Sequence, residues 1–140
     1  MQIQSITGWQ DHIMAGCQYL KTANNGLSRR AVFNNELIFQ LAAMAIEKLM
    51  VGVSQYHRQM PTDHTLSGLV EALAEVCPMD ADLADMIKRI EQIDDMCTLA
   101  PNHRVPPGDV DIQEILIAGH EVAGFAKKHV PMKGMVFKAA

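Results

Sequence analysis

Residues 36–54 decide the fold, and they read ELIFQLAAMAIEKLMVGVS. Apolar side chains recur there every three or four residues, the spacing that aligns side chains along one side of an α-helix. They form two adjacent rows, with Leu37, Leu41 and Met44 in one and Ile38, Ala42, Ile46, Leu49 and Val53 in the other. A helix with so wide an apolar face lies at the centre of a protein. We therefore expect a central helix over residues 29–57, capped by Ser28.

Four further helices are predicted on either side, over residues 8–23, 64–76, 79–99 and 109–130. Asn24, Asn25 and Gly26 end the first helix, and Pro61 ends the central one. Either Thr62 or Asp63 is expected to cap the third helix. Because strand signals are nearly absent and the connections are short, the fold class is all-α, an up-down bundle of about five helices.

The expected inward positions of these four helices also follow helical spacing. They are Trp9, Ile13, Gly16 and Leu20; Leu66, Leu69, Val70 and Leu73; Leu83, Met86, Ile87, Ile90, Ile93 and Cys97; and Ile112, Ile115, Leu116, Gly119, Val122, Ala123 and Ala126. The small residues Gly119 and Gly124 fit either ordinary core packing or a dimer seam. The chain is interpreted as one domain, residues 1–140, with a core over 8–130 and a loosely held tail over 131–140.

The composition narrows the class of protein. The chain has 140 residues, 49% of them hydrophobic and 5% aromatic, with a net charge of -4, a balance that disfavours broad nucleic-acid binding. Its apolar runs are too short for a membrane span and its first seven residues lack the charged region of a secretory signal, so a cytoplasmic protein is expected. Its three cysteines form no CxxC pair, which predicts reduced thiols.

Three segments resemble HEPN domains (higher eukaryotes and prokaryotes nucleotide-binding). FQLAAMAIEKL at 39–49 is similar to the Q-A-x-E-K-x-x-K core of the family's second helix, and PTDHTLSGL at 61–69 is similar to its T-H-x-L-x-x-L helix start. HRVPP at 103–107, followed by an acidic and then basic helix over 109–128, is similar to the turn and last helix. The pattern departs at Gly52, where a lysine is expected, and at Val105, where an aromatic residue is expected.

The resemblance implies a helical bundle that often forms homodimers. It also implies a partner protein, often a minimal nucleotidyltransferase encoded nearby, as in toxin-antitoxin pairs, and the family name suggests a nucleotide ligand. The expected function is therefore that of a non-catalytic helical module. No cofactor is expected.

Many members of the family are ribonucleases, and these carry an arginine followed four to six residues later by a histidine at the start of the last helix. The histidine serves as general acid or base, and the arginine stabilises charge on the phosphate. Arg104 occupies the expected place, but the window after it holds Asp109, Val110 and Asp111. A carboxylate there would repel phosphate, so the catalytic pair is predicted to be absent.

A ribonuclease that uses displaced residues is the alternative. Arg58 and His64 have the right spacing but straddle the turn at Pro61, and His103 beside Arg104 is a second candidate pair.

The candidate ligand-binding residues are Glu47, Lys48, His64 and Arg104. Glu47 interrupts an apolar stretch, so it is expected to be a buried carboxylate that needs a partner, either Lys48, His64 or Arg104. A groove that holds a ligand is the second interpretation of the same residue. The histidine spacing fits no zinc motif, and no metal site is predicted, although His57 and His64 could meet across the turn.

Charge is unevenly distributed along the chain. About half of the acidic residues lie within 71–95, whereas the last fourteen residues are basic, with Lys127, Lys128, His129, Lys133 and Lys138. This pattern fits helix-end complementarity. A second interpretation is a phosphate-facing patch that also includes Arg29, Arg30 and Arg104.

Overall fold

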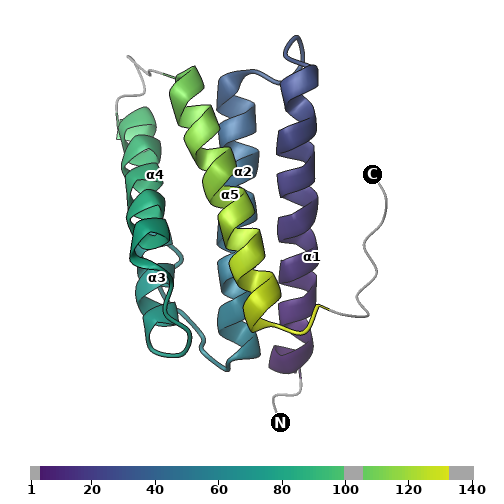
Figure 1. Cartoon of the computed structure of the whole chain (residues 1–140), viewed down its shortest axis with the longest axis vertical. Coiled ribbons are helices and arrows are strands. Elements are labelled where there is room, and N and C mark those ends of the chain that lie inside the picture. Colours follow the sequence, from purple (N-terminus) through teal and green to yellow (C-terminus); the bar gives the residue numbers. More distant parts are fainter. Residues whose placement is uncertain (1–3, 100–105, 133–140) are drawn as a thin grey trace.

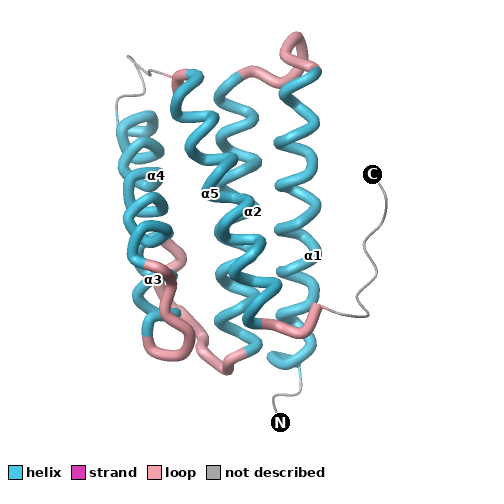
Figure 2. The backbone as a smooth tube through the Cα atoms, viewed as in Figure 1, coloured by secondary structure: helices cyan, strands magenta, loops and turns pink. Residues whose placement is uncertain are grey.

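The computed structural model describes residues 4–99 and 106–132, with side chains over 8–93 and 106–132. Within this part of the chain there are five α-helices and no strand, which confirms the predicted class (Figure 2). The helices are α1 (Gln4–Asn25), α2 (Asn35–Tyr56), α3 (Leu66–Ala74), α4 (Ala81–Leu99) and α5 (Asp109–His129), and a short 3-10 turn, η1 (Gly26–Ser28), follows α1. All five predicted helices are present, and their ends differ from the prediction by a few residues, apart from the start of α2.

The helices form a bundle around α2 (Figure 1). Helices α1 and α2 lie side by side, α5 crosses α2, and α3 and α4 form the flank opposite α1. Helix α2 packs against α1, α5 and α3. The wide apolar face therefore indicated its central position correctly.

The core contains most of the positions expected from helical spacing. Its largest fully buried side chains are Phe39, Ile13, Ile38, Ile46, Leu49, Met50, Leu69, Leu73, Ile87, Ile90, Ile115 and Val53. The prediction of burial is wrong for two residues, Leu37 and Met44, which are 39% and 37% exposed. The neighbouring helices cover the other sides of α2, whereas Leu41, between these two residues in the same row, is partly buried against the core. The side chain of Cys97 lies outside the described residues, as does the tail over 133–140.

Helices α1 and α2 approach closely at two glycines. A Cβ atom on Gly16 would lie 2.6 Å from Cγ of Leu49, and a Cβ on Gly52 would lie 2.7 Å from Cδ1 of Ile13. Each glycine thus receives a large side chain of the other helix, in an antiparallel register. Glycine at 52, the departure from the HEPN pattern, has a packing role here.

The glycines of α5 differ from each other. A Cβ on Gly119 would lie 2.6 Å from Cδ1 of Leu20, so this glycine admits α1 and belongs to the core. Gly124 is exposed, and a Cβ there would meet nothing within 4 Å. Core packing therefore accounts for the first of the two glycines.

The start of α2 corrects the sequence prediction. The expected helix began at Arg29 with Ser28 as its cap, but α2 begins at Asn35 and its cap is Asn34, whose side chain accepts the N–H of Leu37 at 2.8 Å. An asparagine oxygen is among the best N-cap acceptors, and an extended cap backbone favours it. Ser28 instead belongs to the 3-10 turn after α1.

Helices α2 and α5 run in the same direction and are tied at both ends. At the start, Nδ2 of Asn35 donates to the carbonyl of Pro107 at 3.0 Å and to Oδ1 of Asp109 at 3.1 Å. At the other end, His57 Nε2 contacts the carbonyl oxygen of His129 at 3.0 Å. Burial, and then the nearby His57, lower the pKa of the His129 imidazole.

By length and composition α2 is a candidate membrane span, with 22 residues and a mean hydropathy of 1.6. However, 61% of the apolar stretch of α2 is buried inside the bundle. The core helix of a protein can be as long and as apolar as a membrane span. The contacts of α2 with three other helices account for its apolar character.

Two of the three cysteines have described side chains, and both are free thiols. Cys77 is buried and Cys17 is half-buried. Burial raises the pKa of both thiols, which makes them poor nucleophiles.

The end of α2 is closed by a left-handed residue. Arg58 has φ 63°, its N–H donates to the carbonyl of Gln55 at 2.9 Å, and the N–H of Gln59 donates to the carbonyl of Ser54 at 2.8 Å. This pair of bonds is the Schellman motif, in which glycine is the usual left-handed residue. Arg58 occupies a position at which its Cβ is strained.

Replacing Arg58 by glycine should therefore stabilise the protein. Relief of the left-handed strain is worth about 1–2 kcal/mol, and the extra flexibility of glycine in the unfolded chain removes about 0.5–1 kcal/mol of that gain. We expect Arg58→Gly to raise the free energy of unfolding in urea by about 0.5–1 kcal/mol. Arg58→Ala keeps the Cβ atom and is the matched control. Equal stability of the two variants would contradict the conclusion that the left-handed backbone at Arg58 is strained.

Candidate functional site

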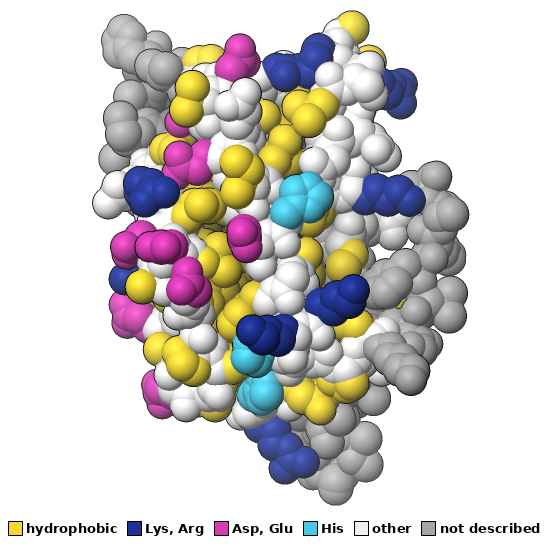
Figure 3. All heavy atoms as spheres, in the orientation of Figure 1, with side chains coloured by type: hydrophobic (Ala, Val, Ile, Leu, Met, Phe, Trp, Pro, Cys, Tyr) yellow, Lys and Arg dark blue, Asp and Glu magenta, His cyan; other side chains and the backbone are white. Residues whose placement is uncertain are grey.

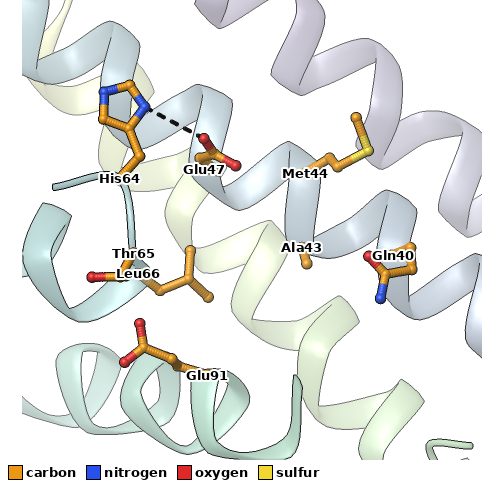
Figure 4. Close-up of a pocket in the computed structure, with 8 residues that line it drawn as sticks. All are labelled: Gln40, Ala43, Met44, Glu47, His64, Thr65, Leu66 and Glu91. Carbon is orange, nitrogen blue, oxygen red and sulfur yellow. Dashed lines mark ion pairs between the residues drawn. The ribbon is translucent and has the colours of Figure 1, made fainter. Parts of the chain in front are cut away.

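A cavity of about 200 Å³ lies where α2 meets the start of α3 and the middle of α4 (Figure 4). Helix α2 contributes one side of its surface through residues three or four positions apart. The lining residues are Gln40, Ala43, Met44, Glu47, His64, Thr65, Leu66 and Glu91. The cavity combines apolar walls with two carboxylates and one imidazole.

Glu47 and His64 point toward each other at this cavity (Figure 4). Nδ1 of His64 lies 3.6 Å from Oε2 of Glu47, and their side chains are 53% and 36% exposed. His64 is therefore one expected partner of Glu47 that the structure places beside it, whereas Arg104 lies outside the described residues. Glu47 is not the buried carboxylate that was expected, because it lies at the solvent edge of α2. An exposed pair of this kind contributes only about 0.2–1 kcal/mol to stability, so its geometry can change at little cost.

Glu91 was missed by the sequence analysis, yet it is the most firmly held carboxylate of the cavity. Its Oε1 accepts the backbone N–H of Ser67 at 3.0 Å, and its Oε2 accepts the hydroxyl proton of Ser67 at 2.8 Å. The carboxylate thus lies at the N-terminus of α3, where the free N–H groups favour negative charge. The contact spans 24 positions along the chain, and no local pattern indicates it.

The start of α3 also corrects its predicted cap. The N-cap is Thr65, whose Oγ1 accepts the N–H of Gly68 at 3.1 Å, and neither Thr62 nor Asp63 caps the helix. Asp63 instead accepts the N–H of Thr65 at 2.9 Å, and this bond lowers the pKa of its carboxyl group. These bonds hold the turn that presents His64 to the cavity.

The other candidate residues do not join His64. Arg58 is exposed at the end of α2 and does not line the cavity, so the structure does not assemble the displaced catalytic pair. Lys48 is half-buried and lies outside the cavity lining. His103 and Arg104 lie outside the described residues.

The described histidines are engaged separately. His57 bonds to the end of α5, whereas His64 pairs with Glu47, so the two do not meet across the turn. Among the residues with described side chains, no group of three or more His, Cys, Asp or Glu residues is placed to hold a metal ion.

The basic side chains expected in one patch lie at opposite ends of the bundle. Arg29 and Arg30 precede the start of α2, where α5 also starts, whereas Lys127 and Lys128 lie in the last turn of α5. The 22 residues of α2 separate these ends by about 33 Å at the helical rise. The interpretation of a single phosphate-facing patch that includes both pairs is therefore wrong.

Size and charge restrict what the cavity can hold. A nucleotide-sized ligand needs a pocket of roughly 300–1,000 Å³, larger than the 200 Å³ found here. Among the residues with described side chains, neither Lys nor Arg lines the cavity, and Glu47 and Glu91 would repel a phosphate. The cavity suits a small group that donates hydrogen bonds.

Comparison with known proteins gives no match: no family model, curated protein or solved structure is similar to the chain. The HEPN resemblance therefore stays a prediction based on the three motifs.

Removing the Glu91 carboxylate should weaken the start of α3. Glu91→Ala removes both acceptors of Ser67, and hydrogen bonds to a charged group contribute about 1.5–3 kcal/mol in protected sites. Since Glu91 is half-buried, we expect a loss of about 1–2 kcal/mol in urea denaturation. Glu121→Ala, at an exposed position of α5, is the control. A loss no larger than that of the control would show that the contact between Glu91 and Ser67 contributes nothing to the free energy of unfolding.

Proposed function

We propose that this protein is a non-catalytic, HEPN-like helical module of the cytoplasm that forms a homodimer and acts with a partner protein. A minimal nucleotidyltransferase is the partner that the resemblance implies. One observation carries the non-catalytic part of the proposal: among the described residues, His64, the histidine of the T-H-x-L segment, faces the carboxylate of Glu47 rather than an arginine.

The chemistry of RNA cleavage explains why this observation matters. Attack of a 2′-hydroxyl needs a general base and a cation that stabilises the negative charge on the phosphate. Around His64 the charged neighbours that line the cavity are Glu47 and Glu91. These carboxylates would destabilise negative charge on a phosphate. Arg58, the arginine at the right spacing, forms the left-handed end of α2.

Nucleotide binding requires a surface other than this cavity. The cavity is too small for a nucleotide, and its carboxylates disfavour phosphate. A nucleotide ligand is therefore implied by the family resemblance alone. The cavity supports a role in binding a smaller group, either a free ligand or a side chain of the partner.

An RNA cleavage assay tests the non-catalytic assignment. Purified protein incubated with end-labelled RNA should release no fragments beyond those of buffer alone, and His64→Ala and Arg58→Ala should behave like the unmodified protein. Cleavage by the unmodified protein that disappears in both variants would overturn the assignment and favour the ribonuclease alternative.

Co-expression tests whether the protein binds the proposed partner. A nucleotidyltransferase encoded beside this chain, co-expressed with it, should elute with it as one complex during size-exclusion chromatography. Separate elution at micromolar concentrations would contradict this half of the proposal.

A further inference from the structure

We propose that the cavity between α2, α3 and α4 binds a guanidinium or alkylammonium group on a short aliphatic stem. The source that fits a partner-dependent module is an arginine or lysine side chain of the partner, and in that respect the inference rests on the proposed function. The same chemistry in a free small amine is the other source, and the experiment separates the two.

Hydrogen-bond acceptors are available on both carboxylates. Each oxygen of Glu91 accepts one hydrogen bond from Ser67, and a carboxylate oxygen can accept two. The distance of 3.6 Å between Oε2 of Glu47 and Nδ1 of His64 is longer than a normal hydrogen bond. Glu47 can therefore accept a hydrogen bond from a ligand. A guanidinium group donates five N–H bonds in a planar fork, which suits acceptors on two sides of a cavity.

The charge balance favours a cation. The N-terminus of α3 carries roughly half a positive charge, which offsets part of the charge of Glu91. Among the residues with described side chains, the exposed His64 forms an ion pair with Glu47. Because the described lining holds two carboxylates and one imidazole, the cavity keeps a net negative charge.

The dimensions and walls fit a side chain. A cavity of about 150 Å³ accommodates a benzene-sized molecule, and the volume of about 200 Å³ leaves room for a guanidinium group with a few methylene groups. Ala43, Met44 and Leu66 supply the apolar wall. Lysine and arginine bury their methylene stems against such surfaces while the charged end finds polar partners.

The surface around the cavity attracts positive charge. Acidic side chains gather over the flank formed by α3 and α4 (Figure 3). The exposed acidic residues in the described part of this flank, Glu71, Glu75, Asp80, Asp82 and Asp85, outnumber the exposed basic ones, Lys88 and Arg89. Such a field raises the local concentration of cations and the rate at which a basic partner associates.

A titration of the full chain followed by NMR tests the inference. Butylguanidinium is added to ¹⁵N-labelled protein at constant ionic strength, about 150 mM, where interactions of distant surface charges are screened. We expect saturable shifts of the amide signals of residues 40–47 and 64–67, with a Kd on the order of 1 mM for so small a ligand. Butanesulfonate, which has the same stem and the opposite charge, should leave these signals unchanged.

Two variants make the test specific. Glu47→Gln should weaken binding by about threefold to fivefold, the effect of one exposed ion pair, and its spectrum reports whether the fold is intact. Glu121→Gln removes the same charge on α5 and should bind as the unmodified protein does. Shifts that do not saturate, or that respond equally to the two variants, would overturn the inference.

The source of the group is decided by two further ligands, agmatine and the capped tripeptide Gly-Arg-Gly. Binding of the tripeptide supports a partner side chain, and binding of agmatine alone supports a free amine. If neither these ligands nor butylguanidinium shifts the cavity signals, the inference fails. The non-catalytic assignment would then be unaffected, because the RNA assay decides it independently.

Discussion

The close approach of α1 and α2 is the constraint on which the rest of the structure depends. Two glycines, Gly16 on α1 and Gly52 on α2, remove the Cβ atoms that would otherwise collide with Leu49 and Ile13. The two long helices therefore pack as a pair, and α2 has the remaining sides of its apolar surface free for α5 and α3. The cavity forms at the edge of this arrangement, where α2 meets the start of α3 and α4.

Helical spacing was enough to predict the five helices, the central place of α2 and most of its buried row. Spacing does not show which of two apolar rows a neighbour will cover, and so Leu37 and Met44 were wrongly placed in the core. The start of α2 was missed because two arginines after Ser28 continue a plausible helix. The decisive residue, Asn34, is recognised as a cap only through its bond to Leu37.

The candidate site was predicted in part. A glutamate inside an apolar stretch indicated a polar contact, and His64, one of its three expected partners, is paired with it. Glu91 could not be found in this way, because its partner Ser67 is distant in sequence and the bond depends on how α3 and α4 pack. Motif spacing alone suggested Arg58 as a catalytic residue, whereas its backbone conformation gives it a structural role. The two carboxylates changed the expected ligand from a phosphate to a cation.

The stability of Gly52→Ala, measured against Gly124→Ala, tests the central packing constraint most directly. Alanine in place of glycine in an unobstructed helix adds about 1 kcal/mol of stability, and this gain is expected at Gly124, where a Cβ meets nothing within 4 Å. At Gly52 the new Cβ collides with Ile13, and overpacking should lower the free energy of unfolding by about 1–3 kcal/mol. Equal stabilisation by both substitutions would contradict the account.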